Sequence, residues 1–353
     1  MKQRIVFLDF VRVMACFLVI LIHTCEPYYL GPNDTIIFGD TANRLWVALI
    51  DGACRASVPL FVMTSSYLLL PLKTGGFEFF RKRGKRIFIP FLFWSVFYAV
   101  IPALQSGAGS DVIIEKTSRL LYTFNNEGGH LWYIWMLVGI YLMMPVISPW
   151  LQKTSRRGEQ IFIGIWIVTS CYYYLRPVLG PLWGQAAWNE FHALYYYSGY
   201  LGYVILAHYI RFRLDWSVKK SMAIGIPLLV VGYILSAGIW YDHTGTSNDY
   251  AYVEQPWHFC TINTIMMTVG TFLIFKCLRT VPNWLYRPIE DMSKLSYGVY
   301  LMHIFMLGIS YSIIGMSLFT PLNILLVSVT TFILSYATGK ILSYIPGSKY
   351  IIG

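Results

Sequence analysis

Charged residues are scarce in this sequence. They account for 12% of its 353 residues, whereas a typical soluble domain has about 25%. Hydrophobic residues account for 56%, and a soluble chain of this length cannot bury so large an apolar share. Six cysteines are too few for a disulfide scaffold, and 28 glycines with 16 prolines are too few for collagen. These absences exclude soluble enzymes and secreted globular domains, and they leave a polytopic membrane protein.

Patterns typical of metal sites are also missing. The cysteines, at positions 16, 25, 54, 171, 260 and 277, show no Cys-x-x-Cys spacing, and none of the seven histidines belongs to a His-Glu-x-x-His motif. All six cysteines fall in or beside apolar runs, where cysteine commonly acts as a small apolar residue. We therefore expect no bound metal.

Long uncharged runs occupy most of the chain. A transmembrane β-strand needs only about 10 residues of alternating polarity, whereas a spanning helix needs about 20 apolar residues. Clear runs occupy 87–110, 128–152, 191–210, 221–241, 255–275 and 295–339, and less clean runs occupy 5–25, 45–70 and 160–175. The run over 295–339 is long enough for two helices, with Gly315 and Pro321 at the turn between them. The sequence predicts an all-α polytopic membrane protein with about ten transmembrane helices, forming one domain over residues 1–353.

Lysine and arginine alternate between abundant and rare from one connecting segment to the next. With the N-terminus placed in the cytoplasm, 21 of the 27 basic residues fall on cytoplasmic ends and loops, and only Arg44, Lys116, Arg119 and Arg176 fall in outer loops. This distribution follows the positive-inside rule and predicts that both termini are cytoplasmic. Contact with anionic inner-leaflet lipid also explains the net charge of +10, so no nucleic-acid partner is expected.

Two predicted helices carry charges inside the membrane, where ionisable residues are costly and mark functional sites by default. The first holds Asp9, Arg12 and His23. Arg12 and His23 are eleven positions apart, about 20° from three whole turns, so both point the same way, about 16 Å apart along the axis. The second holds Asp51 and Arg55 at i,i+4 spacing. Each carboxylate–arginine pair is either a neutralised packing device or part of a site.

A basic cluster over residues 81–86 precedes the third predicted helix. One interpretation is anchoring to acidic lipid headgroups at the inner face. The other is a phosphate clamp, because arginine binds phosphate through two parallel hydrogen bonds and Arg83 and Arg86 would share one helix face. The residues alone leave both interpretations open.

Five motifs resemble those of the acyltransferase-3 family of integral membrane O-acyltransferases, and they cover nearly the whole chain. They are Arg12 and His23 with ten residues between them, Arg55-x-x-Val58-Pro59-Leu60-Phe61, Arg83-x-x-Arg86-Ile87-x-x-Pro90, His130-Leu131-Trp132-Tyr133, and Ser296-x-Gly298-x-Tyr300-x-x-His303. At one position the chain departs from the family, with Ser65-Ser66-Tyr67 in place of Ser-Gly-Tyr. Five motifs in the right order and at the right spans are far more specific than any one of them.

The resemblance implies a multi-pass enzyme of the bacterial cytoplasmic membrane, of the stand-alone type that acts on surface glycans. The donor would be acyl-CoA, with acetyl-CoA as the first expectation, bound at the cytoplasmic side as a substrate and not as a permanent cofactor. The acceptor would be a hydroxyl of a cell-surface or lipid-linked glycan. The expected site residues are His23, Arg12 and His130 as catalytic residues, Arg83, Arg86 and Arg12 as acyl-CoA-binding residues, and Asp9, Arg55, Trp132, Ser296, Tyr300 and His303 as supporting residues.

The expected chemistry suits a histidine. A sugar hydroxyl is a weak nucleophile until a base removes its proton, and imidazole, with a pKa of about 6.5, does so at neutral pH. Direct attack of the hydroxyl is the favoured route, and transfer through an acyl-histidine is the alternative. A second class of function, a polysaccharide transporter or flippase, also fits ten helices and charges near the midplane, although the sequence shows no inverted repeat.

Overall fold

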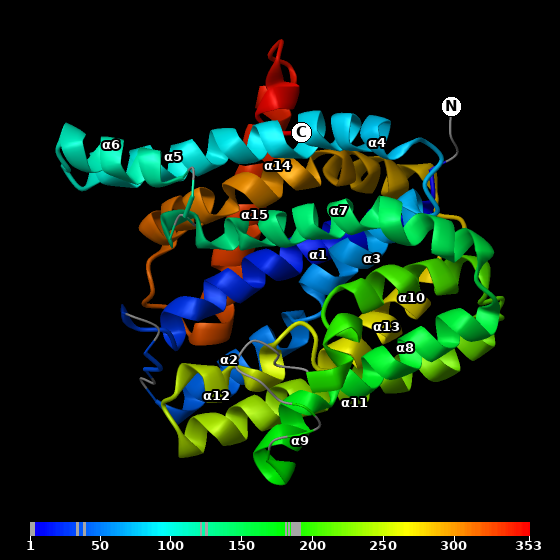
Figure 1. The fold of residues 1–353 in the computed structure, drawn as a ribbon. Helices are drawn as coiled ribbons and strands as arrows, with labels where there is room; N and C mark the ends of the chain where they lie inside the picture. The colour runs from blue at the N-terminus through cyan, green and yellow to red at the C-terminus, as the bar shows by residue number, and fades with distance from the viewer. Residues whose placement is uncertain are drawn as a thin grey trace.

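The computed structural model of the protein describes residues 4–32, 35–37, 40–120, 122–123, 126–180, 182, 184 and 192–353 (Figure 1). Helices dominate this part of the chain, and no β-strand occurs in it beyond a single bridge between Leu30 and Ile36. The prediction of an all-α protein is therefore confirmed.

Fifteen α-helices follow one another along the described residues. They are α1 (Val6–Cys25), α2 (Thr41–Cys54), α3 (Ser57–Leu69), α4 (Gly76–Arg83), α5 (Ile89–Gln105), α6 (Ser110–Arg119), α7 (Trp132–Lys153), α8 (Arg156–Ser170), α9 (Tyr172–Leu179), α10 (Leu201–Phe212), α11 (Val218–Thr246), α12 (Tyr250–Val253), α13 (Ile262–Lys276), α14 (Asn283–Ile314) and α15 (Thr320–Ser343). A π-helical turn over Gly84–Phe88 joins α4 to α5, and a 3₁₀ turn over Glu26–Tyr28 follows α1.

Eight helical segments of the described chain are long and apolar enough to cross a membrane, and a ninth is obtained when α8 and α9, bent by 49°, are counted as one. All the runs predicted to span overlap helices, but not one to one. The runs over 45–70, 160–175 and 295–339 each fall on two consecutive helices, and α10 covers only the second half of the run over 191–210. The number falls just short of ten because α10 has only 12 residues. The turn predicted at Gly315 and Pro321 is confirmed, since α14 ends at Ile314, Gly315 has φ of 74°, and α15 begins with Pro321 in its first turn.

Helix α1 lies at the centre of the bundle, packed against α2, α3, α13, α14 and α15 (Figure 1). Its apolar residues at spacings of three and four are buried, namely Leu8, Val11, Ala15, Val19 and Ile22, as expected for a helix that packs on several neighbours. The polar residues of α1 are therefore held inside the protein. This central position decides where Arg12 and His23 point.

The span that contains α2 and α3 is broken at Arg55. Helix α2 ends at Cys54 and α3 begins at Ser57, and Pro59 provides a physical reason. Its ring has no N–H to donate and would clash with the carbonyl of residue 55 in a continuous helix. Irregular backbone inside a membrane protein is tolerated where it lines a cavity or is buried in protein, so the break marks a place to look for a site.

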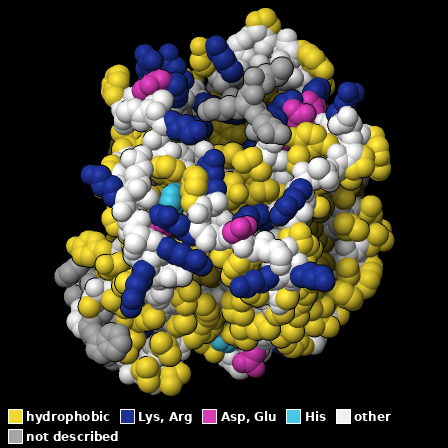
Figure 2. All heavy atoms as spheres, turned by 90° about the vertical axis from the view of Figure 1, so that its right-hand side faces the viewer, with side chains coloured by type: hydrophobic (Ala, Val, Ile, Leu, Met, Phe, Trp, Pro, Cys, Tyr) yellow, Lys and Arg dark blue, Asp and Glu magenta, His cyan; other side chains and the backbone are white. Residues whose placement is uncertain are grey.

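Lysine and arginine side chains gather at one end of the molecule. Figure 2 faces that end, at which the described chain begins and at which α7 and α10 end in Figure 1. Helices α7 and α10 both end at this end of the molecule with a basic residue in the last turn, Lys153 in α7 and Arg211 in α10. This clustering at one end is what the positive-inside pattern requires. That this end faces the cytoplasm stays a prediction, and we call it the basic end.

Candidate active site

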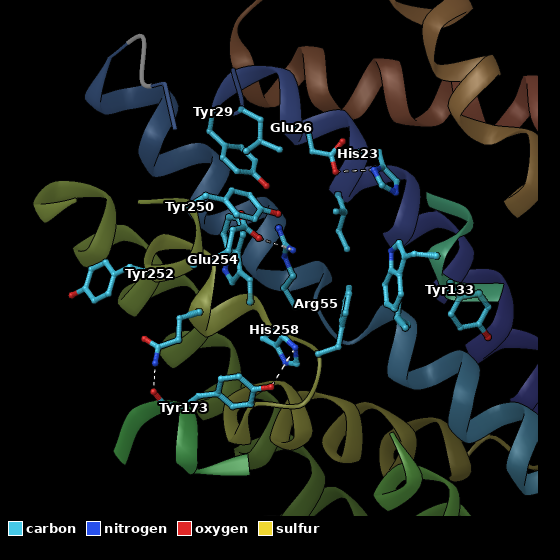
Figure 3. A pocket seen from close by; sticks show the side chains of 18 of the residues that line it. His23, Glu26, Tyr29, Arg55, Tyr133, Tyr173, Tyr250, Tyr252, Glu254 and His258 are labelled. Carbon is cyan, nitrogen blue, oxygen red and sulfur yellow. Dashed lines mark hydrogen bonds and ion pairs between the residues drawn. The ribbon is translucent and has the colours of Figure 1, made fainter. Parts of the chain in front are cut away.

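Helix α1 reaches two cavities, one near each of its ends. The outer cavity has a volume of about 870 Å³ and lies where α1 ends (Figure 3). The inner cavity has a volume of about 910 Å³ and lies where α1 begins, toward the basic end. His23 lines the outer cavity and Arg12 lines the inner one. The predicted common direction of the two side chains thus brings them to separate cavities.

His23 forms a dyad with Glu26 in the outer cavity. The 3₁₀ turn that ends α1 places Glu26 three residues after His23, and the His23 Nδ1 to Glu26 Oε1 distance is 2.8 Å (Figure 3). Because a carboxylate accepts, Nδ1–H donates this hydrogen bond to Glu26, and in the neutral imidazole the lone pair is then on Nε2. The dyad therefore holds a base in the tautomer that can accept a proton from a molecule in the cavity.

Two further imidazoles surround His23. The ring centroid of His303 lies 5.2 Å from that of His23 and 4.9 Å from that of His130, and His23 and His130 are 6.5 Å apart. His130 Nε2 lies 3.3 Å from the Leu301 carbonyl, and His303 Nδ1 lies 2.5 Å from the Tyr300 carbonyl. Each of these nitrogens donates to its carbonyl, which leaves His130 Nδ1 and His303 Nε2 as buried atoms without a hydrogen-bond partner in the described structure.

Within the described ranges, no group of three or more His, Cys, Asp or Glu side chains is arranged to hold a metal ion. The ring nitrogens that face backbone carbonyls are protonated and cannot act as ligands. His130 Nδ1 and His303 Nε2 keep their lone pairs next to the His23–Glu26 dyad.

Arg55 is fixed by two carboxylates and an aromatic ring. The ion pair predicted with Asp51 is present, with Arg55 Nη2 2.7 Å from Asp51 Oδ2, and Arg55 Nη1 lies 3.5 Å from Glu254 Oε2. The guanidinium carbon stands 4.0 Å from the ring centroid of Trp257, a cation–π geometry. Arg55 is 5% exposed and lines the outer cavity. It supplies N–H groups to the cavity without adding a net positive charge.

Aromatic residues make up much of the remaining outer lining. Trp132 stacks on Phe259 with ring centroids 5.6 Å apart and an angle of 23° between the planes. The Tyr173 hydroxyl lies 3.3 Å from His258 Nε2 (Figure 3). The full aromatic lining comprises Tyr29, Trp132, Tyr133, Tyr173, Tyr250, Tyr252, Trp257, Phe259 and Tyr300. The cavity combines flat apolar faces with polar edges.

The inner cavity is strongly basic. Eight basic residues line it, namely Arg4, Arg12, Lys73, Lys82, Arg83, Arg86, Arg211 and Lys294, against the single carboxylate of Asp9. Asp9 is already neutralised, because Arg4 Nη2 lies 2.7 Å from its Oδ1, and it also accepts hydrogen bonds from Ser293 and Tyr286. The predicted pairing of Asp9 with Arg12 is present at 3.7 Å but is the looser contact. The cavity therefore has a large excess of positive charge.

Arg83 and Arg86 reach the inner cavity across the junction of α4 and α5. Arg83 ends α4 and Arg86 lies in the π-helical turn over Gly84–Phe88, and both line the cavity. Turns of this kind inside helices are frequent at functional sites. Both side chains are thus available to an anion in the cavity, as the phosphate-clamp interpretation requires.

The structure distributes the predicted site residues between the two cavities. The outer cavity receives His23, His130, Arg55, Trp132 and Tyr300, and the inner cavity receives Arg12, Arg83, Arg86, Asp9, Ser296 and Tyr300. His303 lies beside His23 and lines neither cavity. Sequence reasoning missed Glu26 and Glu254. The spacing of Glu26 from His23 was a readable signal, whereas Glu254 is 199 positions from Arg55 and gave none.

Comparisons with known proteins agree with this arrangement. A family model described as "Acyltransferase domain", that of the acyltransferase-3 family, matches residues 5–340. A curated relative, "Putative membrane-bound acyltransferase YfiQ" of Bacillus subtilis, is 22% identical over 322 residues, which cover 85% of this chain and 80% of the relative. No solved structure matches the chain. Because the family model covers nearly the whole chain, the protein belongs to the acyltransferase-3 family and is a membrane acyltransferase.

Proposed function

We propose that the protein is an acyl-CoA-dependent O-acyltransferase of the bacterial cytoplasmic membrane. It moves an acyl group, acetyl in the first instance, from acyl-CoA on the cytoplasmic side to a hydroxyl of a cell-surface or lipid-linked glycan. One observation carries the proposal. A single central helix presents Arg12 to a basic inner cavity and His23, with its orienting carboxylate, to an outer cavity. Such an arrangement suits an anionic donor and an acceptor that approach from opposite sides.

The inner cavity suits the phosphates of CoA. Its eight basic residues face a single, already neutralised carboxylate, and charge-assisted hydrogen bonds from arginine to phosphate are about twice as strong as neutral ones. Arg83 is the last residue of α4, and Arg86 lies in the π-helical turn that follows it. In the proposal they bind the phosphates, and Arg12, deeper along α1, lies closer to the thioester.

His23 acts as the base in the proposed reaction. Its Nε2 removes the proton of the acceptor hydroxyl, and the hydroxyl oxygen attacks the thioester carbonyl carbon. The tetrahedral intermediate then breaks the carbon–sulfur bond, and the CoA thiolate takes up the proton that His23 carried. Glu26 stabilises the imidazolium that exists between the two proton transfers. If His23 Nε2 attacked the thioester itself, an acyl-enzyme would accumulate without acceptor, and intact-protein mass spectrometry would detect it.

The outer cavity suits a saccharide acceptor. Aromatic rings and polar groups both line it, including the stacked pair Trp132–Phe259 and the hydrogen-bonded pair Tyr173–His258. Its lining carboxylates Glu26 and Glu254 are matched in number by Arg55 and Arg176, and Arg55 is also paired with Asp51. A neutral molecule with many hydroxyl groups therefore fits better than a strongly charged one.

Purified protein in nanodiscs tests the chemistry. Wild-type protein is expected to release CoA thiol from acetyl-CoA when a glycan acceptor is present. His23→Ala is expected to lower this rate by about 10²–10⁴, the usual effect of losing a general base, with acetyl-CoA binding unchanged. His243→Asn is the control, because His243 binds a backbone carbonyl and does not line the cavity. If correctly folded wild-type protein releases no thiol, the alternative hypothesis of a polysaccharide transporter would be favoured over an acyltransferase.

A double variant tests the donor site. Replacing Arg83 and Arg86 with alanine removes two cationic partners of the phosphates, each hydrogen bond to a charged group contributing about 1.5–3 kcal/mol. Acetyl-CoA binding is expected to weaken at least about tenfold. The matched control replaces Arg157 and Arg279, which are exposed and lie outside the inner cavity. Unchanged acetyl-CoA affinity in the first variant would make the cluster a lipid anchor.

A further inference from the structure

Two tyrosines separate the cavities. Tyr133 of α7 and Tyr300 of α14 are the residues that line both the outer and the inner cavity in the described structure. Their ring centroids are 5.4 Å apart at an angle of 70°, an edge-to-face contact. Tyr133 is 7% exposed and Tyr300 is 6% exposed. The two rings therefore form a wall whose opposite faces belong to different cavities.

The wall is thin, as α1 shows. Arg12 lines the inner cavity and Val19 lines the outer one, and the residues between them, including Ala15 and Cys16, line neither. Seven residues of α-helix span about 10 Å. A donor whose phosphates stay on the inner side must therefore bring its thioester across about 10 Å to reach the outer cavity.

The two rings are held differently. The Tyr300 hydroxyl donates to the backbone carbonyl of His130, and its ring lies 5.8 Å from that of His130 and 5.6 Å from that of His303. Tyr133 contacts Phe61 of α3 with ring centroids 6.0 Å apart. Tyr300 is thus tied to the histidine cluster, while Tyr133 lies on the side of α3, next to the inner cavity that Phe61 also lines.

Beyond the wall, apolar side chains line the outer cavity near His23. Val19 lies one helical turn, about 6 Å, below His23, and Ile22 and Val58 line the same cavity. With carbon–carbon bonds of about 1.5 Å, this depth holds an acyl chain of about two to four carbons. A longer chain would extend into the part of the cavity that the acceptor must occupy.

We infer that Tyr133 and Tyr300 are specificity-determining residues. Their rings flank the thioester as it crosses between the cavities, and Tyr133, on the side of α3, limits how far an acyl chain can extend. This inference rests on the proposed acyl-CoA-dependent transfer. In this inference the two tyrosines determine which acyl chain lengths are used. Phosphate binding remains the role of the inner cavity, and proton removal remains the role of His23.

Acyl-CoA substrates of increasing chain length test the inference. Wild-type protein is expected to use acetyl-CoA and butyryl-CoA well and octanoyl-CoA poorly. Tyr133→Ala is expected to raise the ratio of kcat/KM for octanoyl-CoA to that for acetyl-CoA by at least about tenfold, because a pocket wall discriminates by about 10–200-fold per methylene. Tyr133→Phe, which keeps the ring, is expected to preserve the ratio. Tyr141→Ala, at a tyrosine that lines only the inner cavity, is expected to preserve it as well.

The outcomes separate this inference from the proposed function. A wild-type protein that releases no thiol from acetyl-CoA refutes the function before any variant is made. If the wild-type protein uses octanoyl-CoA with the same efficiency as acetyl-CoA, the inference that the wall selects the acyl chain is refuted without any variant. If acetyl transfer is observed but Tyr133→Ala keeps the wild-type ratio, the tyrosines do not select the chain. Should Tyr133→Ala fail to fold, Tyr133→Trp, with a larger ring, is expected to lower the use of butyryl-CoA relative to acetyl-CoA, and an unchanged ratio there also overturns the inference.

Discussion

The dyad of His23 and Glu26 makes the sharpest prediction. Glu26→Gln keeps the size of the side chain and an oxygen that accepts from His23 Nδ1, so the tautomer is preserved and only the negative charge is lost. A hydrogen bond to a charged group contributes about 1.5–3 kcal/mol. His23 and Glu26 are 17% and 34% exposed, so we take the lower half of this range. The expected loss in kcat is about 10–40-fold.

The measurement is a steady-state assay of thiol release with saturating acceptor. In the proposed mechanism Glu26 stabilises a charge that His23 gains during the reaction, so kcat should fall while the affinity for acetyl-CoA stays constant. Glu26→Ala should lose more, since His23 is then free to rotate or to change tautomer. Glu115→Gln is the control, because Glu115 forms an exposed ion pair with Arg119 on α6, away from both cavities.

Two results would refute this reasoning. If Glu26→Gln retained wild-type kcat, the carboxylate would not act through His23. If kcat and the affinity for acetyl-CoA fell together, Glu26 would serve the fold and not the reaction. A parallel loss of thermal stability would point to the same structural role.

Two other predictions concern topology and pH. The topology is tested with single-cysteine variants on a background without native cysteines. Asn248→Cys, in the connection between α11 and α12, should react with an impermeant thiol reagent in intact cells, whereas Lys153→Cys should react only after lysis. The reverse pattern would show that the predicted orientation is inverted. Burial raises the pKa of Glu254 above its usual value, so the folded state binds the carboxyl proton of Glu254 more tightly than the unfolded state does. The stabilisation of the folded state that results is present at low pH and is lost as pH rises above about 4.5 through the folded pKa. Raising the pH from 4.5 to 8 should therefore lower the Tm of the wild type more than that of Glu254→Gln, and equal slopes would contradict the assignment.

Features set by local geometry could be predicted from the sequence. The common direction of Arg12 and His23 follows from eleven steps of an α-helix, and the Asp51–Arg55 pair follows from i,i+4 spacing. The turn at Gly315 was also readable, because a positive φ favours glycine. These expectations needed no knowledge of how the helices pack.

Features that depend on packing between distant helices could not be predicted in this way. The contact of Arg55 with Glu254 and that of Tyr133 with Tyr300 each join residues far apart in the chain. A charge pattern also could not reveal that the basic residues at the start of α1 and around α4 would line one cavity. Spacing predicts the face of a helix, but the neighbour that covers this face is decided by tertiary packing.

The different charges of the two cavities indicate which part of the donor can pass from the inner cavity to the outer one. In the proposed mechanism the phosphates of CoA stay among the basic residues of the inner cavity, and only the neutral thioester end of the donor crosses the wall of Tyr133 and Tyr300. Moving a phosphate through the buried interior would carry the large desolvation cost of an unpaired charge, whereas an acetyl group carries none. Arg55 is already paired with the two carboxylates of Asp51 and Glu254, so it offers no compensating attraction for an anion. A transporter of anionic lipid-linked sugars would need the opposite arrangement, a continuous basic path, and the described lining of the outer cavity does not provide it.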